Sequence, residues 1–277
     1  MTKVQKRGKR IAFIILFIVA AIWILPILWG VLTSFKSEAE IQRLGFSFLP
    51  KQFTFSNYGK LINNDSAPVF RWFLNSLIIA TCSTILNVFV VSFAAYGYTR
   101  LHFKGRDVLF TFLLSTMMFP GIVNLIPMFK IVDFLGWTDN FLAVIVPSAA
   151  GVFNVFLVRQ FMLGIPKELD ESALIDGANE FQIFRYIIFP LTKPVLAVVA
   201  LFSFTGSWND FLWPSVVMSS VDKLPITPGL QLLQGQYTTY PGIATAGAIF
   251  ALIPTFILYL FAQKYFLQSM SLQSGIK

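Results

Sequence analysis

Six long apolar blocks dominate this chain of 277 residues and restrict what it can fold into. A helix rises about 1.5 Å per residue, so about 20 mostly apolar residues are needed to cross about 30 Å of hydrocarbon. The blocks that reach this length are residues 11–33, 72–96, 108–128, 140–161, 194–217 and 243–263. A β-barrel would show short alternating segments instead. The sequence therefore predicts an all-α integral membrane protein with six transmembrane helices.

Composition supports a membrane environment. Hydrophobic residues make up 56% of the chain and charged residues 12%, against roughly 25% charged residues in an ordinary soluble domain. The basic start of the chain, followed by an apolar run, could be a secretory signal. That run is longer than the 7–15 residues of a signal core and lacks a small-residue cleavage site, so we expect a retained first helix.

The distribution of Lys and Arg predicts the orientation, because cytoplasmic loops retain these residues. If the N-terminus is cytoplasmic, 14 of the 21 Lys and Arg residues fall on the cytoplasmic side. Most of the others lie in or beside one long outer loop, residues 35–71. We therefore expect cytoplasmic tails at residues 1–10 and 267–277 around a membrane domain at residues 11–266. The net charge of +8 is then a topology signal and does not indicate nucleic-acid binding.

Several kinds of chemistry are missing from the sequence. Cys82 and His102 are each the only residue of their type, so we expect no internal disulfide and no histidine-based metal site. There is no G-x-x-x-x-G-K-[ST] phosphate loop and no catalytic cluster, so the chain is not expected to be an enzyme. Arg159 lies at the cytoplasmic end of its span, which leaves Asp210 as the only Asp, Glu, Lys or Arg in the interior of a predicted span. A single Asp is a poor relay for an ion-coupled transporter. Energy for transport would have to come from a separate ATPase.

A long cytoplasmic loop at residues 162–193 carries much of the acidic charge of the chain. Pro166 is suited to the start of a helix and Gly177 to its end. A second amphipathic stretch follows, with Phe181, Phe184 and Ile188 on one side. Two short helices would then form a compact knob. The alternative is a helix pair lying on lipid headgroups, but anionic lipids attract basic residues, so the acids favour a protein partner with a basic cleft.

The same loop resembles a known family. Glu171-Ser172-Ala173, then Gly177, then Ile187-Ile188-Phe189-Pro190 match the E-A-A-x3-G-x9-I-x-L-P loop of membrane subunits of binding-protein-dependent ABC importers. The match departs only at Ser172 and Phe189. Along almost the whole chain the sequence is similar to the carbohydrate branch, in particular to the smaller membrane subunit of maltose-type importers. The supporting stretches are Asn75-Ser76, Ala94-Ala95-Tyr96 with Arg100, Phe119-Pro120, Asp176-Gly177-Ala178, Trp208-Asn209-Asp210-Phe211 and residues 263–277.

The resemblance implies a type I ABC importer permease fold in the cytoplasmic membrane of a prokaryote. It implies a heterodimer with a second permease subunit, two ATPase subunits that bind ATP and Mg, and an extracytoplasmic solute-binding protein. This chain itself would hold no cofactor. The acidic loop would be the coupling helix between helices four and five, seated in a cleft of the ATPase. The coupling residues would be Glu168, Glu171, Ser172, Ala173, Asp176, Gly177, Ala178, Phe181 and Phe184.

Two further sets of residues are candidates for contact with sugar or with the binding protein. Aromatic faces and planar amide or carboxylate groups suit sugars, and Trp208, Asn209, Asp210 and Trp213 offer them on the fifth span. Alternatively, Asn209 and Asp210 pair with the partner subunit or satisfy backbone groups freed by Pro214. The outer segment 218–242 is predicted to be a flexible loop. By resemblance, it would reach the sugar site of the binding protein through Gln231, Gln234, Gln236 or Tyr237, or it would merely cover the cavity mouth.

Four functions are compatible with these patterns. The first is a permease subunit of an ABC importer for an oligosaccharide. The same machine for glycerol-3-phosphate or its diesters would favour more arginine in the cavity than the sequence offers. An ion-coupled transporter would work as a single polypeptide without ATP. A membrane scaffold for assembly or sensing would not need the coupling motif.

Overall fold

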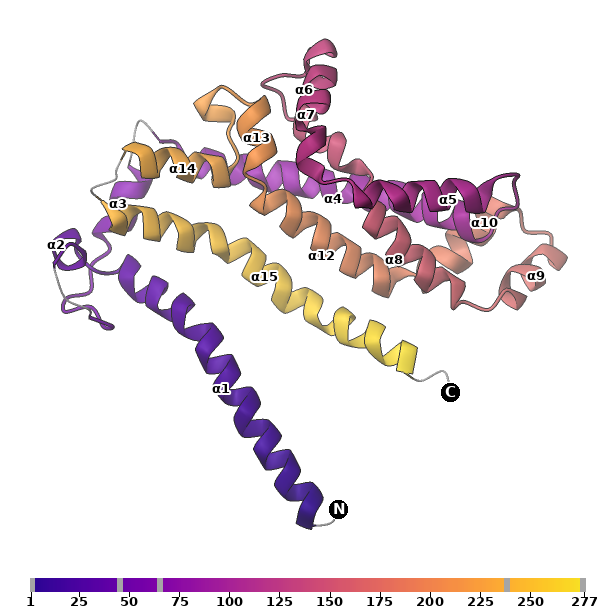
Figure 1. Cartoon of the computed structure of the whole chain (residues 1–277), viewed down its shortest axis with the longest axis horizontal. Coiled ribbons are helices and arrows are strands. Elements are labelled where there is room, and N and C mark those ends of the chain that lie inside the picture. Colours follow the sequence, from indigo (N-terminus) through magenta and orange to yellow (C-terminus); the bar gives the residue numbers. More distant parts are fainter. Residues whose placement is uncertain (1–2, 44–46, 64–66, 237–239, 275–277) are drawn as a thin grey trace. The chain divides into compact units, whose positions relative to one another are not determined.

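The chain is helical in the part that the structure describes. The computed structural model describes residues 3–43, 47–63, 67–236 and 240–274, which contain helices, turns and bends but no strand (Figure 1). The chain divides into two compact units. One unit comprises Met1–Val69 and Leu230–Ile253, and the other comprises Phe70–Gly229 and Pro254–Lys277.

The first unit contains the long apolar helix α1 (Lys3–Ser34) and two short helices, α2 (Glu38–Ile41) and α3 (Ser56–Ile62). The buried Asn57 donates from Nδ2 to the carbonyls of Ser34 and Lys36, which ties α3 to the end of α1. The Glu38 carboxylate accepts a hydrogen bond from the backbone of Gly242 in α15 (Pro241–Ser274). Polar contacts therefore organise the described part of the predicted outer loop.

The second unit holds most of the remaining helices, whose colours in Figure 1 follow their order in the sequence. They are α4 (Val69–Thr99), α5 (Arg106–Ser115), η1 (Thr116–Met118), η2 (Gly121–Asn124), α6 (Leu125–Phe134), α7 (Leu142–Ile145), η3 (Pro147–Ala149), α8 (Val152–Leu163), α9 (Glu168–Ile175), α10 (Glu180–Ile183), the π-helical η4 (Phe184–Ile188), α11 (Phe189–Leu191), α12 (Lys193–Asn209), α13 (Leu212–Val217) and η5 (Val221–Lys223). Helix α14 (Ile226–Gln236) begins in this unit and ends in the other.

Four predicted spans are long apolar stretches, and two are bent. Gly8–Ser34, Val69–Thr99, Leu142–Leu163 and Pro241–Gln263 are long and apolar enough to cross a membrane. Two bent helix pairs raise the possible number of spans to six. The predicted straight span 108–128 is instead broken, with Arg106–Met118 and Gly121–Phe134 at 97° to each other. The break lies at Phe119, which is extended because the following Pro120 disfavours helical backbone there.

Proline also explains an interruption in the predicted span 194–217. Helix α12 ends at Asn209, and Asp210 is extended, with φ −66° and ψ 123°. Pro214 follows four residues later, so it has no N–H for the Asp210 carbonyl and its ring would clash with that carbonyl in a helix. The segment therefore continues as the separate short helix α13.

The predicted span 140–161 is interrupted between η3 and α8, at Ala150 and Gly151. Carbonyls freed inside a membrane protein need other partners. The buried Asn87 of α4 supplies them, since its Nδ2 lies 3.1 Å from both the Ser148 and the Ala149 carbonyl oxygen. Side chains of a neighbouring helix thus stabilise the interruption.

A hydrophobic core joins the last turns of α4 to elements that precede and follow α9. Its members come from α4, α5, α8, α10, η4 and α12 and from the connection after α8. The buried residues are Val91, Ala95, Tyr96, Phe110, Val155, Val158, Met162, Ile165, Ile183, Phe184, Ile188, Val195, Leu196 and Val199. This core anchors the predicted coupling loop to the membrane helices.

Close packing at Gly229 of α14 leads to a stability prediction. An added Cβ at Gly229 would overlap the Trp72 ring. That ring is 1% exposed and is held by a hydrogen bond from its Nε1 to the Val221 carbonyl, so it has little freedom to move. We expect Gly229→Ala to lower the free energy of unfolding by about 1–3 kcal/mol, the usual cost of overpacking.

Thermal unfolding in detergent would measure this effect, with Gly97→Ala as the matched control. An added Cβ at Gly97 meets nothing within 4 Å. Both variants gain the same helix propensity of about 1 kcal/mol. Equal melting temperatures for the two variants would show that overlap with the Trp72 ring does not lower the stability.

Candidate functional site

The predicted coupling helix is present as α9, and its end has a defined geometry. Gly177 has φ +84°, a conformation that favours glycine. Its N–H donates to the Leu174 carbonyl at 3.0 Å, and the Ala178 N–H donates to the Ala173 carbonyl at 2.9 Å. This pair of bonds is a Schellman motif, which satisfies the last carbonyls of the helix. The predicted stop at Gly177 is confirmed.

A second short helix follows directly. Asn179 caps α10 in a capping box with Gln182, each side chain accepting from the backbone of the other residue. Helix α10 then continues into the π-helical turn η4 and into α11. We call residues 168–191, which comprise α9 to α11, the acidic segment. Two short helices meeting at Gly177 agree with the predicted knob.

The apolar face of the second helix differs from the prediction. Phe184 and Ile188 are buried as expected, but Phe181 is 57% exposed and Ile183 is buried in its place. A π turn contains an extra residue, which changes the positions that share one face. Phe181 therefore does not share the buried face of Phe184 and Ile188.

Helix α9 leaves most of its side chains free. None of its residues is buried, and Ile175 is 87% exposed. Its exposed residues combine acidic and large apolar side chains, namely Glu168, Leu169, Glu171, Ser172, Leu174 and Ile175, and Asp176 and Gly177 just after it are exposed as well. Ala173 and Ala178 are partly buried against the core. Most of the predicted coupling residues are therefore exposed, whereas Ala173, Ala178 and Phe184 lie against or within the hydrophobic core.

Sequence reasoning missed how the acidic segment is fastened. Asp170, an acid in the first turn of α9, forms an ion pair at 2.9 Å with Arg100, the residue directly after α4. Glu180 accepts a hydrogen bond from the Tyr96 hydroxyl at 2.7 Å. Burial raises the pKa of the Asp170 carboxyl, and the charge of Arg100 opposes that shift. The sequence offered one signal for this attachment. Asp170 stands three residues before Ala173, so the two share a helix face, and a small residue such as Ala173 suits the packed face.

A cavity of about 320 Å³ lies among the helices of the second unit. Polar side chains from α4, α8 and α12 meet aromatic and aliphatic ones there. The lining residues are Asn87, Met128, Val144, Pro147, Ser148, Gly151, Asn154, Phe202, Ser203, Gly206, Ser207, Asp210 and Trp213. Among the residues that the structure describes, no Lys or Arg lines it, and Asp210 is the one carboxylate.

The structure places two of the four predicted substrate residues at this cavity. Asp210 and Trp213 line it. Trp208 is 1% exposed and stacks on Phe204 at 5.7 Å, so it is a packing residue. Asn209 is exposed, and its Nδ2 donates to the Thr205 carbonyl in the same helix. The interpretation of Trp208 and Asn209 as cavity residues is not supported by their positions.

Asp210 also has the alternative, local role of satisfying backbone groups near Pro214. Its Oδ1 accepts from the Trp213 backbone N–H at 3.4 Å, which caps α13 after the break. The Trp213 indole donates to the Ala143 carbonyl at 2.8 Å. Asp210 and Trp213 therefore shape the cavity wall as well as facing it.

The polar groups of the cavity are suited to hydroxyl ligands. Asn154 donates from Nδ2 to Asn87 Oδ1 at 2.9 Å, so the two amides form one fixed pair. The Ser207 hydroxyl is buried and has no hydrogen-bond partner among the described residues. A free hydroxyl, an amide pair and aromatic walls offer both donors and acceptors beside apolar faces. Sequence reasoning missed Asn87, Asn154 and Ser207, because the pairs join residues far apart in the chain.

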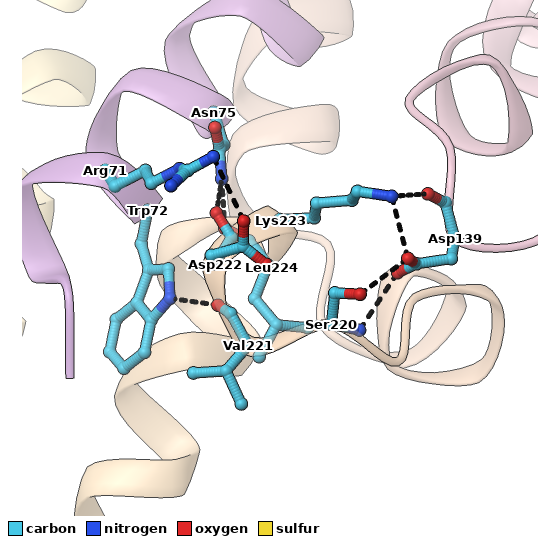
Figure 2. A network of polar contacts seen from close by, with 9 residues as sticks. All are labelled: Arg71, Trp72, Asn75, Asp139, Ser220, Val221, Asp222, Lys223 and Leu224. Carbon is cyan, nitrogen blue, oxygen red and sulfur yellow. Dashed lines mark hydrogen bonds and ion pairs between the residues drawn. The ribbon is translucent and has the colours of Figure 1, made fainter. Parts of the chain in front are cut away.

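The predicted flexible loop at residues 218–242 is largely ordered in its described part. Figure 2 shows residues 220–224 held between α4 and Asp139. On one side, the Asn75 amide donates to the Asp222 and Leu224 carbonyls, and Arg71 forms an ion pair with Asp222 at 3.0 Å. These contacts fix the segment to the start of α4.

Asp139 holds the other side of the same segment. Its carboxylate accepts from the Ser219 and Ser220 backbone, from the Ser220 hydroxyl and from Lys223 at 2.8 Å (Figure 2). The bond from Lys223 is the main reason that the pKa of Asp139 lies well below its ordinary value. The prediction of a flexible loop is therefore wrong for these residues.

Helix α14 occupies much of the rest of the 218–242 segment. Gln231 lies in α14 and is exposed, whereas Leu233 is buried. The side chains of Gln234 and Gln236 and the whole of Tyr237 lie outside the described residues. Of the four predicted binding-protein contacts, only Gln231 is placed by the structure.

Comparison with known proteins agrees with this architecture. Residues 87–272 match the family model described as "Binding-protein-dependent transport system inner membrane component". The arabinooligosaccharides transport system permease protein AraQ of Bacillus subtilis is 36% identical over 97% of this chain and 96% of its own. The galactooligosaccharides transport system permease protein GanQ of the same organism is 32% identical over 94% of this chain and 93% of its own.

A solved structure extends the similarity to three dimensions. The crystal structure of a bacterial ABC transporter involved in the import of the acidic polysaccharide alginate contains a chain 25% identical to this one. The match has a TM-score of 0.82 and covers 96% of this chain and 99% of the other. These relatives are transport permeases and not enzymes. The chain has the type I permease fold, it is a multi-pass membrane protein, and it belongs to the family of inner membrane components of binding-protein-dependent transport systems.

Proposed function

We propose that this chain is a permease subunit of an ABC importer that moves an oligosaccharide into the cytoplasm by alternating access. Separate ATPase subunits, which bind ATP and Mg, supply the energy. The complex contains a second permease subunit, two ATPase subunits and an extracytoplasmic solute-binding protein. Both termini, including residues 1–10 and 267–277, lie in the cytoplasm, and this chain holds no cofactor.

The observation that carries this proposal is the free surface of α9. Asp170 and Ala173 fasten the helix to the rest of the chain, while most of its acidic and large apolar side chains are exposed. An exposed patch of this kind indicates a protein partner. We assign that partner as an ATPase subunit whose basic cleft faces Glu168 and Glu171.

The cavity supports a neutral sugar as the substrate. Its lining carries amides, hydroxyls and aromatic rings, and it has no cation to pair with a phosphate. The names of the relatives AraQ and GanQ refer to oligosaccharides. We therefore assign Asp210 and Trp213, together with the Asn87–Asn154 pair and Ser207, to the sugar pathway. Gln231, Gln234, Gln236 and Tyr237 remain candidates for contact with the binding protein.

Co-purification tests the docking role of α9. We expect Glu171→Lys to weaken retention of the ATPase subunits by the co-expressed complex, because it reverses a charge that faces a basic cleft. Asp107→Lys is the control, since Asp107 is also an exposed acid in the first turn of a helix. The docking assignment fails if both variants retain the ATPase as well as the wild type does.

A further inference from the structure

Two side chains at the end of α4 hold the two short helices of the acidic segment: Tyr96 in its last turn and Arg100 directly after its last residue. The Tyr96 hydroxyl donates to Glu180 Oε2, at the start of α10, at 2.7 Å. Arg100 Nε lies 2.9 Å from Asp170 Oδ2 in α9, and Arg100 Nη2 donates to the Ile165 carbonyl at 2.9 Å. Both helices of the segment are therefore fastened to the same end of one long helix.

The Arg100–Asp170 pair is the main polar contact that orients α9. Packing contributes little, because no α9 residue is buried and Ala173 is the member of α9 that touches the core. The pair itself is shielded, with side chains 5% and 16% exposed. The planar guanidinium is itself fixed by the bond from Nη2 to the Ile165 carbonyl, so its charge stands at a fixed place beside α9. Removing the pair would leave α9 loosely held.

The tether at Tyr96 has a different character. The Tyr96 ring packs against Phe184 with ring centroids 5.1 Å apart, and Phe93 packs on the same Phe184 ring at 4.6 Å. The 180–188 region is thus held by apolar packing as well as by the hydroxyl. The ring contact keeps Tyr96 close to this region, and the hydrogen bond to Glu180 fixes the orientation of the start of α10.

Stability alone does not explain a buried charge pair at this place. Taking two charges out of water is costly, and apolar residues of similar volume are often as stabilising. Asp170 Oδ1 and Arg100 Nε are both buried without a hydrogen-bond partner among the described residues, so the pair is held by its opposite charges and is not fully satisfied. A charge contact at this cost is better explained by a need to hold α9 in place against α4.

Helix α4 also reaches the cavity. Asn87 lies on the same unbroken helix, nine residues before Tyr96, which corresponds to about 13.5 Å along the axis. Asn87 lines the cavity and binds the Ser148 and Ala149 carbonyls in its wall. A rigid helix therefore connects the acidic segment to the wall of the cavity.

We propose that Tyr96 and Arg100 are positioning residues that transmit displacement of the acidic segment through α4 to the Asn87 wall of the cavity. This inference rests on the proposed function, in which an ATPase subunit moves α9. The motion would pass from α9 to Arg100, along α4, and from Asn87 to the carbonyls between η3 and α8. Without the tether, ATP hydrolysis would continue but would move the cavity wall less.

The test is the number of sugar molecules transported per ATP hydrolysed by the assembled complex in proteoliposomes. Arg100→Met combined with Asp170→Leu removes the pair without leaving a buried unpaired charge. We expect the double variant to assemble and to show a ratio of sugar to ATP that is about tenfold lower. The interaction energy between two contacting residues is typically large enough for about a tenfold change. Tyr96→Phe, which retains the ring, should lower the ratio less.

Arg159→Met is the control for loss of a basic residue beside the same core. Arg159 lies over the Phe110 ring at 4.0 Å and donates from Nε to the Tyr98 carbonyl, and both of these partners lie outside the acidic segment. It should leave the ratio unchanged. If the double variant does not assemble, Tyr96→Phe decides the question. A wild-type ratio in the assembled double variant would overturn the inference, as would a wild-type ratio in Tyr96→Phe if the double variant does not assemble. The proposed function fails by a different result, which is a wild-type complex that shows no ATP-driven uptake.

Discussion

Replacing Gly177 by tryptophan is expected to abolish coupled transport. Within this chain nothing lies within 4 Å of an added Cβ at Gly177, so the fold itself has room for a side chain. The loss of transport would result mainly from a clash between the tryptophan ring and the ATPase subunit, which we propose lies close to this turn. We expect ATPase binding to weaken by about 30-fold or more, the size of an interface hot spot of about 2 kcal/mol. Affinity of the detergent-solubilised permease pair for the ATPase would measure it.

Two controls separate backbone strain from bulk. Gly177→Asn keeps a residue that tolerates positive φ and adds little volume. Gly105→Trp adds the same bulk at another glycine with φ +84° and open surroundings, but outside the acidic segment. Both should bind the ATPase far better than Gly177→Trp. If Gly105→Trp weakens binding equally, the loss reflects strain and not a close approach to the ATPase.

Gly206→Phe is expected to stop sugar transport by filling the cavity. Gly206 lines the cavity, and an added Cβ there meets nothing within 4 Å, so the ring would enter the space of about 320 Å³. One methylene group in a pocket already changes discrimination by about 10–200-fold, so we expect transport to fall by more than about tenfold. Uptake of labelled oligosaccharide into proteoliposomes would show the loss, with the ATPase still bound.

Gly206→Ala and Gly121→Phe are the matched controls for this variant. The first adds one methyl group at the same place, and the second adds the same ring at an exposed glycine that does not line the cavity. Both should retain most of the transport. Normal uptake by Gly206→Phe would show that sugar does not pass through this cavity.

Features set by local chemistry were predictable from the sequence. The length and polarity of the apolar blocks indicate membrane helices, because few other environments accept them. The end of α9 at Gly177 follows from one residue that tolerates positive φ. The class of all-α membrane protein and the end of the first helix of the acidic segment therefore follow from local chemistry, whereas the type I permease fold was implied only by the family resemblance.

Features that depend on contacts between distant residues were not predictable. The bend at Phe119 and the interruption at Asp210 each result from a proline whose effect on a membrane helix depends on the surrounding partners. The Arg100–Asp170 pair and the Asn87–Asn154 pair join separate helices. Residues such as Trp208 look functional by type, but only packing shows that its ring is covered.

ATP-driven accumulation of sugar is the most direct test of the proposed function. The full complex would be reconstituted in proteoliposomes with the sugar-loaded binding protein on the face opposite the ATPase subunits. We expect accumulation against a concentration gradient only when ATP and Mg are supplied, and none from proton or sodium gradients. Sugar accumulation by this chain alone, driven by an ion gradient, would contradict the assignment as an ABC importer subunit.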